Sequence, residues 1–241
     1  VKFGMSYTYR GYAAVQTIAR MVQNGDLGQV RKVMVDYSQG WLSELVESGD
    51  NKQAAWRTDP QFSGAGGTIA DIGTHAFNLA EYVSNLKIKQ LTAQVSTLVD
   101  KRVIDDDANI LTKYENGATG TISVGQALTG EDNALRIQVY GDKGGIIWDH
   151  HTPNEIVFKA DHSVRSIIVS ISQQETDKMN ARLSQKHAPV FLKGFSDIYN
   201  RFAKAIVNDK ETSPNIEDGV RGMLFIEKAI ESSTKGQWVA R

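Results

Sequence analysis

The sequence predicts an α+β fold, in which a large, mostly antiparallel open sheet carries its helices on one face. Apolar residues recur at helical spacing near both ends of the chain, and short alternating strands joined by short turns fill its middle. The composition, 41% hydrophobic and 23% charged over 241 residues, is that of a globular protein with enough apolar side chain for a core. Four prolines and no visible repeat favour one domain.

The first half of the chain alternates helix and strand signals. Apolar Val15, Ile18 and Val22 recur at helical spacing, and Gly25 and Gly28 follow them as a helix end. Further segments alternate apolar and polar side chains, which is typical of a strand with one buried face. We therefore expect a helix over Ala13–Gly28, a strand over Val30–Ser38, a loop with a short helix over Trp41–Phe62 and a helix over Asp71–Ser84.

The second half begins with strands and ends with helices. Asn116-Gly117 lies between two alternating segments, which is a strong signal for a hairpin turn. Pro214 and Asn215 precede the last apolar-periodic segment, where a helix start favours them. The expected strands cover Leu91–Val99, Ala108–Tyr114, Ala118–Gly125, Leu135–Tyr140, Gly145–Trp148, Glu155–Lys159 and Val164–Ser170, and the expected helices cover Val190–Val207 and Ile216–Ser233.

One face of the expected sheet carries short polar side chains with few charges. Such a face can meet water, or it can pack as a flat interface against a second copy of the chain, and the residues alone leave both possibilities open. The residues on this face are Thr92, Gln94, Ser96, Thr119, Thr121, Ser123, Arg136 and Gln138.

Charge and composition exclude several classes of partner. With 27 basic and 28 acidic residues the formal charge is −1, so no long-range field favours nucleic acid or an anionic membrane. No apolar run approaches the roughly 20 residues that span a bilayer. The absence of cysteine excludes disulfides, thiolate nucleophiles and cysteine-bound metals, and it fits a cytoplasmic location.

A glycine-rich segment at positions 63–75 invites a phosphate-loop interpretation, but the spacing does not support it. After Gly64 and Gly66, the next glycine of a dinucleotide fingerprint would stand at position 69, which is Ile69. A P-loop would also need a lysine followed by serine or threonine. We expect instead that the glycines let the backbone pass close to a ligand or to another element.

Asp71 and His75 form the strongest candidate pair. A spacing of four residues places both on one helix face, about one turn apart. An imidazole can take and return a proton near neutral pH, and a carboxylate one turn away can orient it or bind a substrate hydroxyl. The alternative is structural: Asp71 as an N-cap and His75 as a partly buried, hydrogen-bonded helix residue.

Two other pairs combine an aromatic ring with a fixed cation. Trp56-Arg57 suits a sugar-like or anionic ligand, because indole rings stack and guanidinium groups bond to oxygens. Tyr9-Arg10 has the same character. Either pair can equally be an ordinary surface pair.

Two charged clusters are expected to be structural. The carboxylates of Asp105, Asp106 and Asp107 could bind a hard cation, but three adjacent acids before a strand usually form a solvated turn. His150 and His151 are neighbours in an expected turn, and adjacent histidines cannot easily converge on one metal ion without further ligands.

Several of these motifs together resemble the substrate-side signature of the Gfo/Idh/MocA oxidoreductases, which include glucose–fructose oxidoreductase and inositol dehydrogenase. The resemblance covers nearly the whole chain. It is carried by Tyr7–Arg10, Gly25–Gly28, Trp56-Arg57-x-Asp59-Pro60, Gly66-Gly67-Thr-Ile-Ala-Asp71-Ile-Gly73-Thr-His75, Asp106–Gly120 and Ile216–Val239.

The resemblance implies a two-domain enzyme, in which an N-terminal Rossmann domain binds NAD or NADP and a C-terminal domain closes over a sugar or polyol. Residues 1–10 then correspond to the crossover from the Rossmann domain, and residues 11–241 to the substrate-binding and oligomerisation domain. The glycine-rich fingerprint and the Glu-Lys-Pro segment with the family's catalytic lysine are not in this sequence. We therefore expect this chain alone to be inactive. The family's open sheets commonly pair, which implies a homodimer or homotetramer.

The resemblance also implies roles for individual residues. His75 would be the catalytic histidine that moves the hydroxyl proton, and Asp71 the catalytic carboxylate that holds the reacting oxygen. The side chains that would line the substrate are Trp56, Arg57, Tyr9 and Arg10. Two alternatives stay open: a non-catalytic sugar-sensing or assembly module on the same scaffold, and metal-assisted hydrolysis by Asp71, His75 and another histidine, which would need bound zinc.

Overall fold

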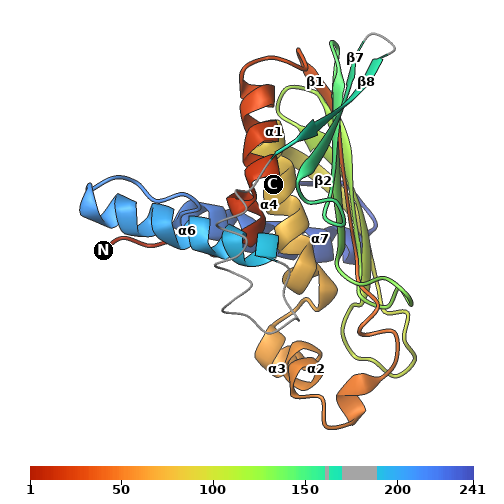
Figure 1. Ribbon diagram of the computed structural model, residues 1–241. Coiled ribbons are helices and arrows are strands. Elements are labelled where there is room, and N and C mark those ends of the chain that lie inside the picture. The colour runs from red at the N-terminus through yellow and green to blue at the C-terminus, as the bar shows by residue number, and fades with distance from the viewer. Residues whose placement is uncertain (161–162, 170–188) are drawn as a thin grey trace.

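A single mixed sheet organises the molecule (Figure 1). The computed structural model describes residues 1–160, 163–169 and 189–241, and within them the strand order is β8-β7-β6-β5-β1-β4-β3-β2-β9. Neighbouring strands are antiparallel except β1 and β4, which run parallel. The strands are β1 Val30–Ser38, β2 Ile88–Ser96, β3 Asp107–Tyr114, β4 Thr119–Gly125, β5 Ala134–Gly141, β6 Gly145–Asp149, β7 Glu155–Ala160, β8 Ser163–Ile168 and β9 Val239–Ala240.

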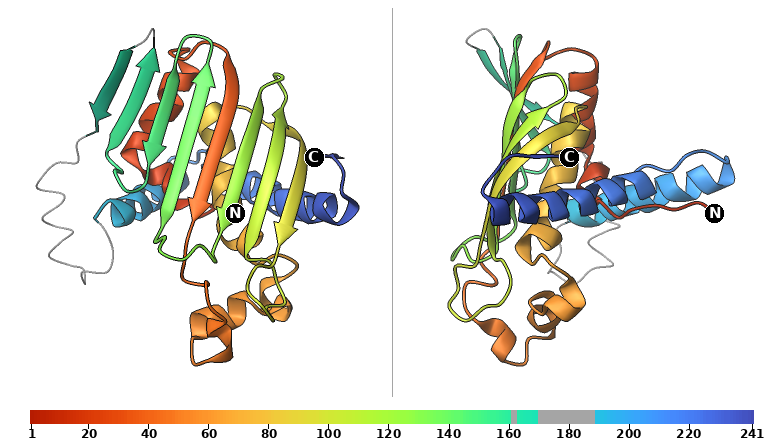
Figure 2. Two further views of the ribbon diagram at one scale, coloured as in Figure 1. Left: turned by 90° about the vertical axis from the view of Figure 1, so that its right-hand side faces the viewer. Right: turned by 180° about the vertical axis from the view of Figure 1, so that it is seen from behind.

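The helices lie on one face of the sheet and leave the other face open, as the edge-on and face-on views show (Figures 1 and 2). Helices α4 and α7 pack on the sheet, α1 packs on α4, and α6 projects outward as an arm. The predicted α+β class, with a mostly antiparallel open sheet, is confirmed. The helices are α1 Ala13–Gln23, α2 Lys52–Arg57, α3 Pro60–Ser63, α4 Thr74–Ser84, α6 Pro189–Val207 and α7 Ile216–Lys235.

Several element boundaries differ from the sequence prediction, and three of the differences have a clear local basis. Helix α1 ends at Gln23 rather than Gly28, because Gly25 takes a left-handed φ of 82° and turns the chain. Strand β2 ends at Ser96, because the N–H groups of Leu98 and Val99 donate to the Asp106 carboxylate instead of to a neighbouring strand. The helix predicted over Asp71–Ser84 is an α-helix only from Thr74, after one π-helical turn over Ile69–Gly73. The final residue of the predicted strand Val164–Ser170 lies outside the described residues.

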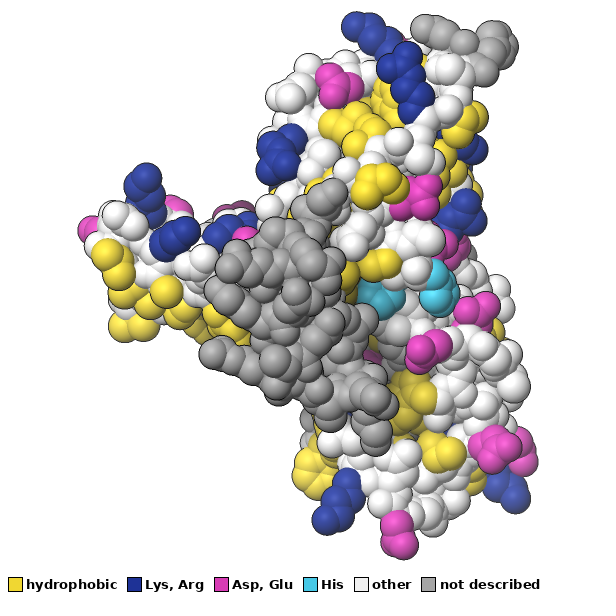
Figure 3. All heavy atoms as spheres, viewed as in Figure 1, with side chains coloured by type: hydrophobic (Ala, Val, Ile, Leu, Met, Phe, Trp, Pro, Cys, Tyr) yellow, Lys and Arg dark blue, Asp and Glu magenta, His cyan; other side chains and the backbone are white. Residues whose placement is uncertain are grey.

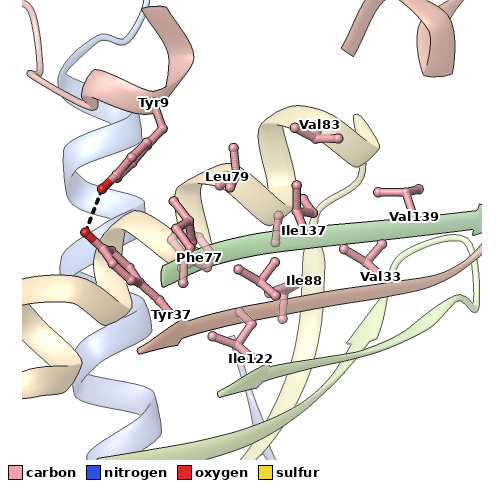
Figure 4. Packing of buried hydrophobic residues seen from close by; sticks show 14 of the residues in the cluster. Tyr9, Val33, Tyr37, Phe77, Leu79, Val83, Ile88, Ile122, Ile137 and Val139 are labelled. Carbon is pink, nitrogen blue, oxygen red and sulfur yellow. Dashed lines mark hydrogen bonds between the residues drawn. The ribbon is translucent and has the colours of Figure 1, made fainter. Parts of the chain in front are cut away.

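The core fills the space between the sheet and its helices (Figure 4). Val33 on β1, Ile122 on β4 and Ile137 on β5 point toward Phe77 and Leu79 on α4, and all five side chains are at most 1% exposed. Burying each such side chain contributes about 1.5–3 kcal/mol. The alternating burial along β1, β4 and β5 is the cause of the alternation in the sequence.

The open face of the sheet carries rows of side chains that the register aligns across strands. All eight residues predicted on this face are exposed or half-buried. One row contains no charged group, and it runs Thr92, Leu111, Thr121, Met34, Gln138 and Ile147. Leu111 is 51% exposed there. This row is called the uncharged row below.

Among the described residues, no helix combines the length and the apolar character that crossing a bilayer requires.

Candidate active site

A cleft of about 750 Å³ opens beside the helix side of the sheet, where several distant segments meet. Tyr9 comes from the short 3₁₀ turn Thr8–Gly11, Tyr37 from the end of β1, and Asp71 from the π-helical turn. His75 lies in the first turn of α4, and His150 follows β6. Figure 3 shows histidine side chains at this face of the molecule, close to acidic ones.

The turn that carries Asp71 is fixed from outside by a buried carboxylate. Asp105 accepts hydrogen bonds from the backbone N–H groups of Gly67 (2.6 Å) and Ile69 (2.8 Å). A Cβ atom at Gly67 would collide with the backbone oxygen of Asp105, so the close approach requires glycine. The predicted role of the glycines, to let the backbone pass close to another element, is therefore confirmed at Gly67.

Asp71 and His75 both line the cleft, on successive turns. One oxygen of Asp71, Oδ2, accepts a hydrogen bond from Gln126 Nε2 (2.8 Å) and lies 3.4 Å from Nε of Arg57. The Asp71 side chain is 33% exposed, so it remains open to a ligand in the cleft. Arg57 brings the α2 segment against the catalytic candidates, and its guanidinium also stacks over the Trp56 ring at 4.1 Å.

The imidazole of His75 is held by packing. Its ring meets the rings of Tyr7 and Tyr9 edge-to-face, with both centroid distances at 5.7 Å. Its Nδ1 atom is buried and has no hydrogen-bond partner among the described residues. Burial lowers the pKa of His75, and the nearby Asp71 charge opposes that shift only in part. His75 is therefore neutral at pH 7 and available as a base.

A closed set of hydrogen bonds forms one wall of the cleft. Tyr37 O–H donates to Asn133 Oδ1 (2.6 Å), and Asn133 Nδ2 donates to the Tyr9 oxygen (3.1 Å). The Tyr9 hydroxyl therefore donates to Tyr37, 2.6 Å away (Figure 4). Burial raises the pKa of both tyrosines, so both keep their protons and donate them within this set.

Two of the residues expected to bind substrate lie elsewhere. The Arg10 guanidinium is buried and bonds to Asn78 (2.8 Å) and Asp218 (2.7 Å), and Arg10 is not among the described residues that line the cleft. The structure thus shows Arg10 in an ion pair with Asp218, and its contact with substrate stays a prediction. Trp56 is 45% exposed and lines a smaller adjacent pocket of about 260 Å³, which shares Arg57 and Asp71 with the cleft.

The acidic cluster that we expected to form a solvated turn is largely buried, and that expectation was wrong. Asp105 is 9% exposed and Asp106 is fully buried. Asp106 accepts from the N–H groups of Leu98 and Val99 and pairs with Arg102 at 2.9 Å. The partners of Asp106 lie in an irregular loop, and a loop has no helical or strand period that would identify them in the sequence.

Sequence reasoning also missed two residues of the cleft, His150 and Asn133, and one of the adjacent pocket, Gln126. His150, expected to be only structural, lines the cleft, and its Nε2 lies 3.1 Å from the Tyr12 hydroxyl. Gln126 and Asn133 were not singled out, although both follow or precede predicted strands, the positions where a sheet presents polar side chains to a site. Among the described residues, no three His, Asp or Glu side chains are grouped as a metal site.

The comparisons of this chain with known proteins agree on one family. Residues 15–147, more than half of the chain, match the family described as GFO/IDH/MocA C-terminal domain. The chain is 28% identical to Uncharacterized oxidoreductase YfiI of Bacillus subtilis (strain 168), over 98% of this chain and 64% of that protein. It is 22% identical to Levoglucosan dehydrogenase of Pseudarthrobacter phenanthrenivorans, over 98% of this chain and 65% of that protein.

A solved structure with the same fold is that of an inositol dehydrogenase homolog complexed with NAD⁺ from Azotobacter vinelandii. It superposes with a TM-score of 0.85 at 25% identity, covering 99% of this chain and 64% of that one. The chain thus spans a little under two thirds of the length of these relatives.

Proposed function

This chain belongs to the Gfo/Idh/MocA family, and from that premise we propose that it is the substrate-binding and oligomerisation domain of an oxidoreductase. The enzyme would transfer hydride between NAD or NADP and a hydroxyl-bearing carbon of a sugar or polyol. The observation that carries the proposal is that Asp71 and a neutral His75 line the same cleft. The relatives named as a levoglucosan dehydrogenase and an NAD⁺-bound inositol dehydrogenase homolog support the substrate class and the cofactor.

The proposed chemistry divides between the cofactor and this chain. When bound, the nicotinamide supplies the acceptor for hydride from the carbinol carbon. His75 takes the hydroxyl proton during oxidation and returns it during reduction. Asp71 stabilises the imidazolium that forms, and it can accept a hydrogen bond from a neighbouring substrate hydroxyl. The position of His75 at the open cleft fits this role, and no residue of this chain is assigned to holding the cofactor.

The remaining side chains of the cleft would orient the substrate. Tyr9 and Tyr37 present hydroxyl groups held in one hydrogen-bonded set, and Arg57 can bond to ring hydroxyls beside Asp71. Trp56 would contact only a substituent that reaches the adjacent pocket. Neutral hydroxyls and one paired cation suit a polyhydroxylated, uncharged ligand better than a free anion.

The cofactor would be held mainly by a nucleotide-binding domain that precedes residues 1–10. An exposed apolar strip along α6 supports a further folded part on the helix side, because exposed apolar surface of this extent marks interaction sites (Figure 3). Tyr199 is 59% exposed there and Val207 83%. We expect no turnover from residues 1–241 alone, and we expect the enzyme to act in the cytoplasm.

Assembly would use the open sheet face. Part of the uncharged row lines a shallow hollow of about 330 Å³ over β2, β3 and β4. A second copy could cover this face by symmetry. We propose a homodimer or homotetramer built through this face.

Replacing His75 with alanine tests the proposal in the protein that joins this chain to its nucleotide-binding domain. With NAD⁺ and either levoglucosan or myo-inositol, His75→Ala should lower kcat by roughly 10²–10⁴-fold, since the proton acceptor is lost. His151→Ala is the matched control, because His151 is exposed and bonds only to Asp149 among the described residues. An unchanged rate in His75→Ala would contradict the assignment, and no turnover of any polyol by the starting protein would favour the sensing module.

A further inference from the structure

Gln126 stands directly after β4, at the wall between the cleft and the smaller pocket. Its side chain is almost fully buried, and the residue is 1% exposed. Its Nε2 donates to Asp71 Oδ2 at 2.8 Å and to Gln39 Oε1 at 3.0 Å. A buried amide with both donors used in this way is a fixed group rather than a space-filler.

The direction of this amide follows from its two partners, Asp71 and Thr68. The Asp71 carboxylate can only accept, so the amide nitrogen faces it, and the fully buried Thr68 hydroxyl donates to Gln126 Oε1 at 2.8 Å. The Thr68 backbone N–H in turn donates to the backbone oxygen of Asp105 at 3.0 Å. The orientation of Gln126 is thus set by the same segment that holds the π-helical turn.

We propose that Gln126 is a positioning residue for Asp71: it binds one carboxylate oxygen against the cleft wall and leaves the other oxygen to the substrate hydroxyl. Within the described part of the chain, the polar contacts that Gln126 and Arg57 make with the Asp71 carboxylate both fall on Oδ2. The proposal rests on the proposed function of Asp71. It adds a residue that touches neither substrate nor cofactor and acts through the carboxylate.

The surroundings of Asp71 also define what a charge at position 126 would do. An introduced carboxyl group would stand one hydrogen bond from Asp71, and that neighbouring negative charge would raise the pKa of the new group. While protonated it can still donate to Asp71, but once ionised it repels Asp71. The titratable or charged groups that face this point are Arg57 from α2, His75 from α4, Tyr9 from the 3₁₀ turn, Tyr37 from β1 and Asp105 from the loop before β3.

Gln126→Glu and Gln126→Met separate a positioning role from a merely structural one. In the intact enzyme, the kcat/KM of Gln126→Glu relative to the starting protein should be near one at acidic pH. It should fall about tenfold or more as the pH rises and the new carboxyl ionises. Gln126→Met should lose about tenfold or more at every pH, because the donor to a charged oxygen is gone. Gln23→Glu, the same change at an exposed site at the end of α1, should keep a ratio near one throughout.

Two further measurements keep the outcome decisive. Thr68→Val removes the hydroxyl that bonds to Gln126 at nearly constant volume. It should lower kcat/KM, as Gln126→Met does, and it supplies this test if Gln126→Met folds poorly. The NMR titration of His75 in this chain should show a second inflection in Gln126→Glu. A pH-independent ratio in Gln126→Glu together with no second inflection would overturn the positioning role. If His75→Ala leaves the rate unchanged while the inflection is present, it is the proposed function that fails.

Discussion

At the residue scale, burial and a neighbouring charge act on the same imidazole in opposite directions. Burial of His75 favours the neutral ring, while Asp71 favours the charged one, and burial is the larger effect. The pKa of His150 is lowered in the same direction, because its ring is buried and because the nearby His151 adds to that shift. Both rings therefore stay neutral at pH values where an exposed histidine would already be protonated.

A pH dependence of stability follows. The unfolded chain binds protons at a histidine pKa of about 6.5, whereas the folded chain binds them only at lower pH. The free energy of unfolding should therefore decrease as the pH falls below about 6.5, by at most about 1.4 kcal/mol per pH unit for each histidine, until the folded-state pKa is passed. Urea unfolding at pH 7.5 and 5.5 measures this decrease.

The comparison that isolates the two rings is between variants. His75→Gln combined with His150→Gln should show a smaller decrease between the two pH values than the starting protein. His151→Gln, at an exposed position, should show the full decrease. Equal decreases in all three proteins would mean that carboxylates, not the cleft histidines, control acid stability.

At the element scale, one arginine joins two irregular segments that lie far apart in the sequence. Arg102, whose side chain is fully buried, pairs with Asp106 (2.9 Å) and Glu47 (2.7 Å). It also donates to the backbone carbonyls of Leu42 (2.7 Å) and Glu44 (2.8 Å). The loop before β3 is thereby tied to the segment that leads into α2, which carries Arg57 to the cleft.

Arg102→Met should destabilise the fold strongly. The substitution leaves the fully buried Asp106 carboxylate without its cation, and an uncompensated buried charge costs about 3–5 kcal/mol. Denaturant unfolding measures the loss. Arg31→Met is the control, because Arg31 is 69% exposed and 3.9 Å from Asp142, so its removal should change stability very little. A loss no larger than that of the control would show that Arg102 does not hold the two segments.

At the scale of the whole molecule, the sheet has one covered face and one open face (Figure 2). The register, not the chain order, gathers the uncharged row, since its members come from six strands. Row members such as Thr121 and Met34 are already half-buried, and none of the six is charged. A partner sheet that covers them would therefore remove little hydration of polar groups. These properties favour a self-complementary interface.

Leu111→Arg tests that interface. Leu111 is half exposed in the uncharged row, between Thr92 and Thr121, and a charge there would be buried without a partner in a sheet-to-sheet dimer. Sedimentation velocity should show the starting chain as an oligomer and Leu111→Arg as a smaller species. Ile216→Arg, on the helix side at 58% exposure, should leave the size unchanged. A monomeric starting chain would contradict the proposed interface.

Local patterns in the sequence determined much of this molecule. The alternation in β1, β4 and β5, the Asn116-Gly117 turn and the four-residue spacing of Asp71 and His75 are properties of neighbouring residues, so they could be interpreted without knowing what lies opposite. The α+β class and the open polar face followed from them, because burial imposes a period of two on strands and 3.6 on helices.

Only the tertiary structure decided which distant segments meet. It placed β1 parallel to β4, added β9 beside β2, turned Arg10 to Asp218, and brought Gln126 against Asp71. Each of these contacts joins residues more than 50 positions apart, and it depends on the packing of the whole sheet against its helices. Pairing of that kind leaves no period in the sequence, because a hydrogen bond or an ion pair involves a single residue on each side. A buried face, in contrast, requires apolar residues at regular intervals along the chain.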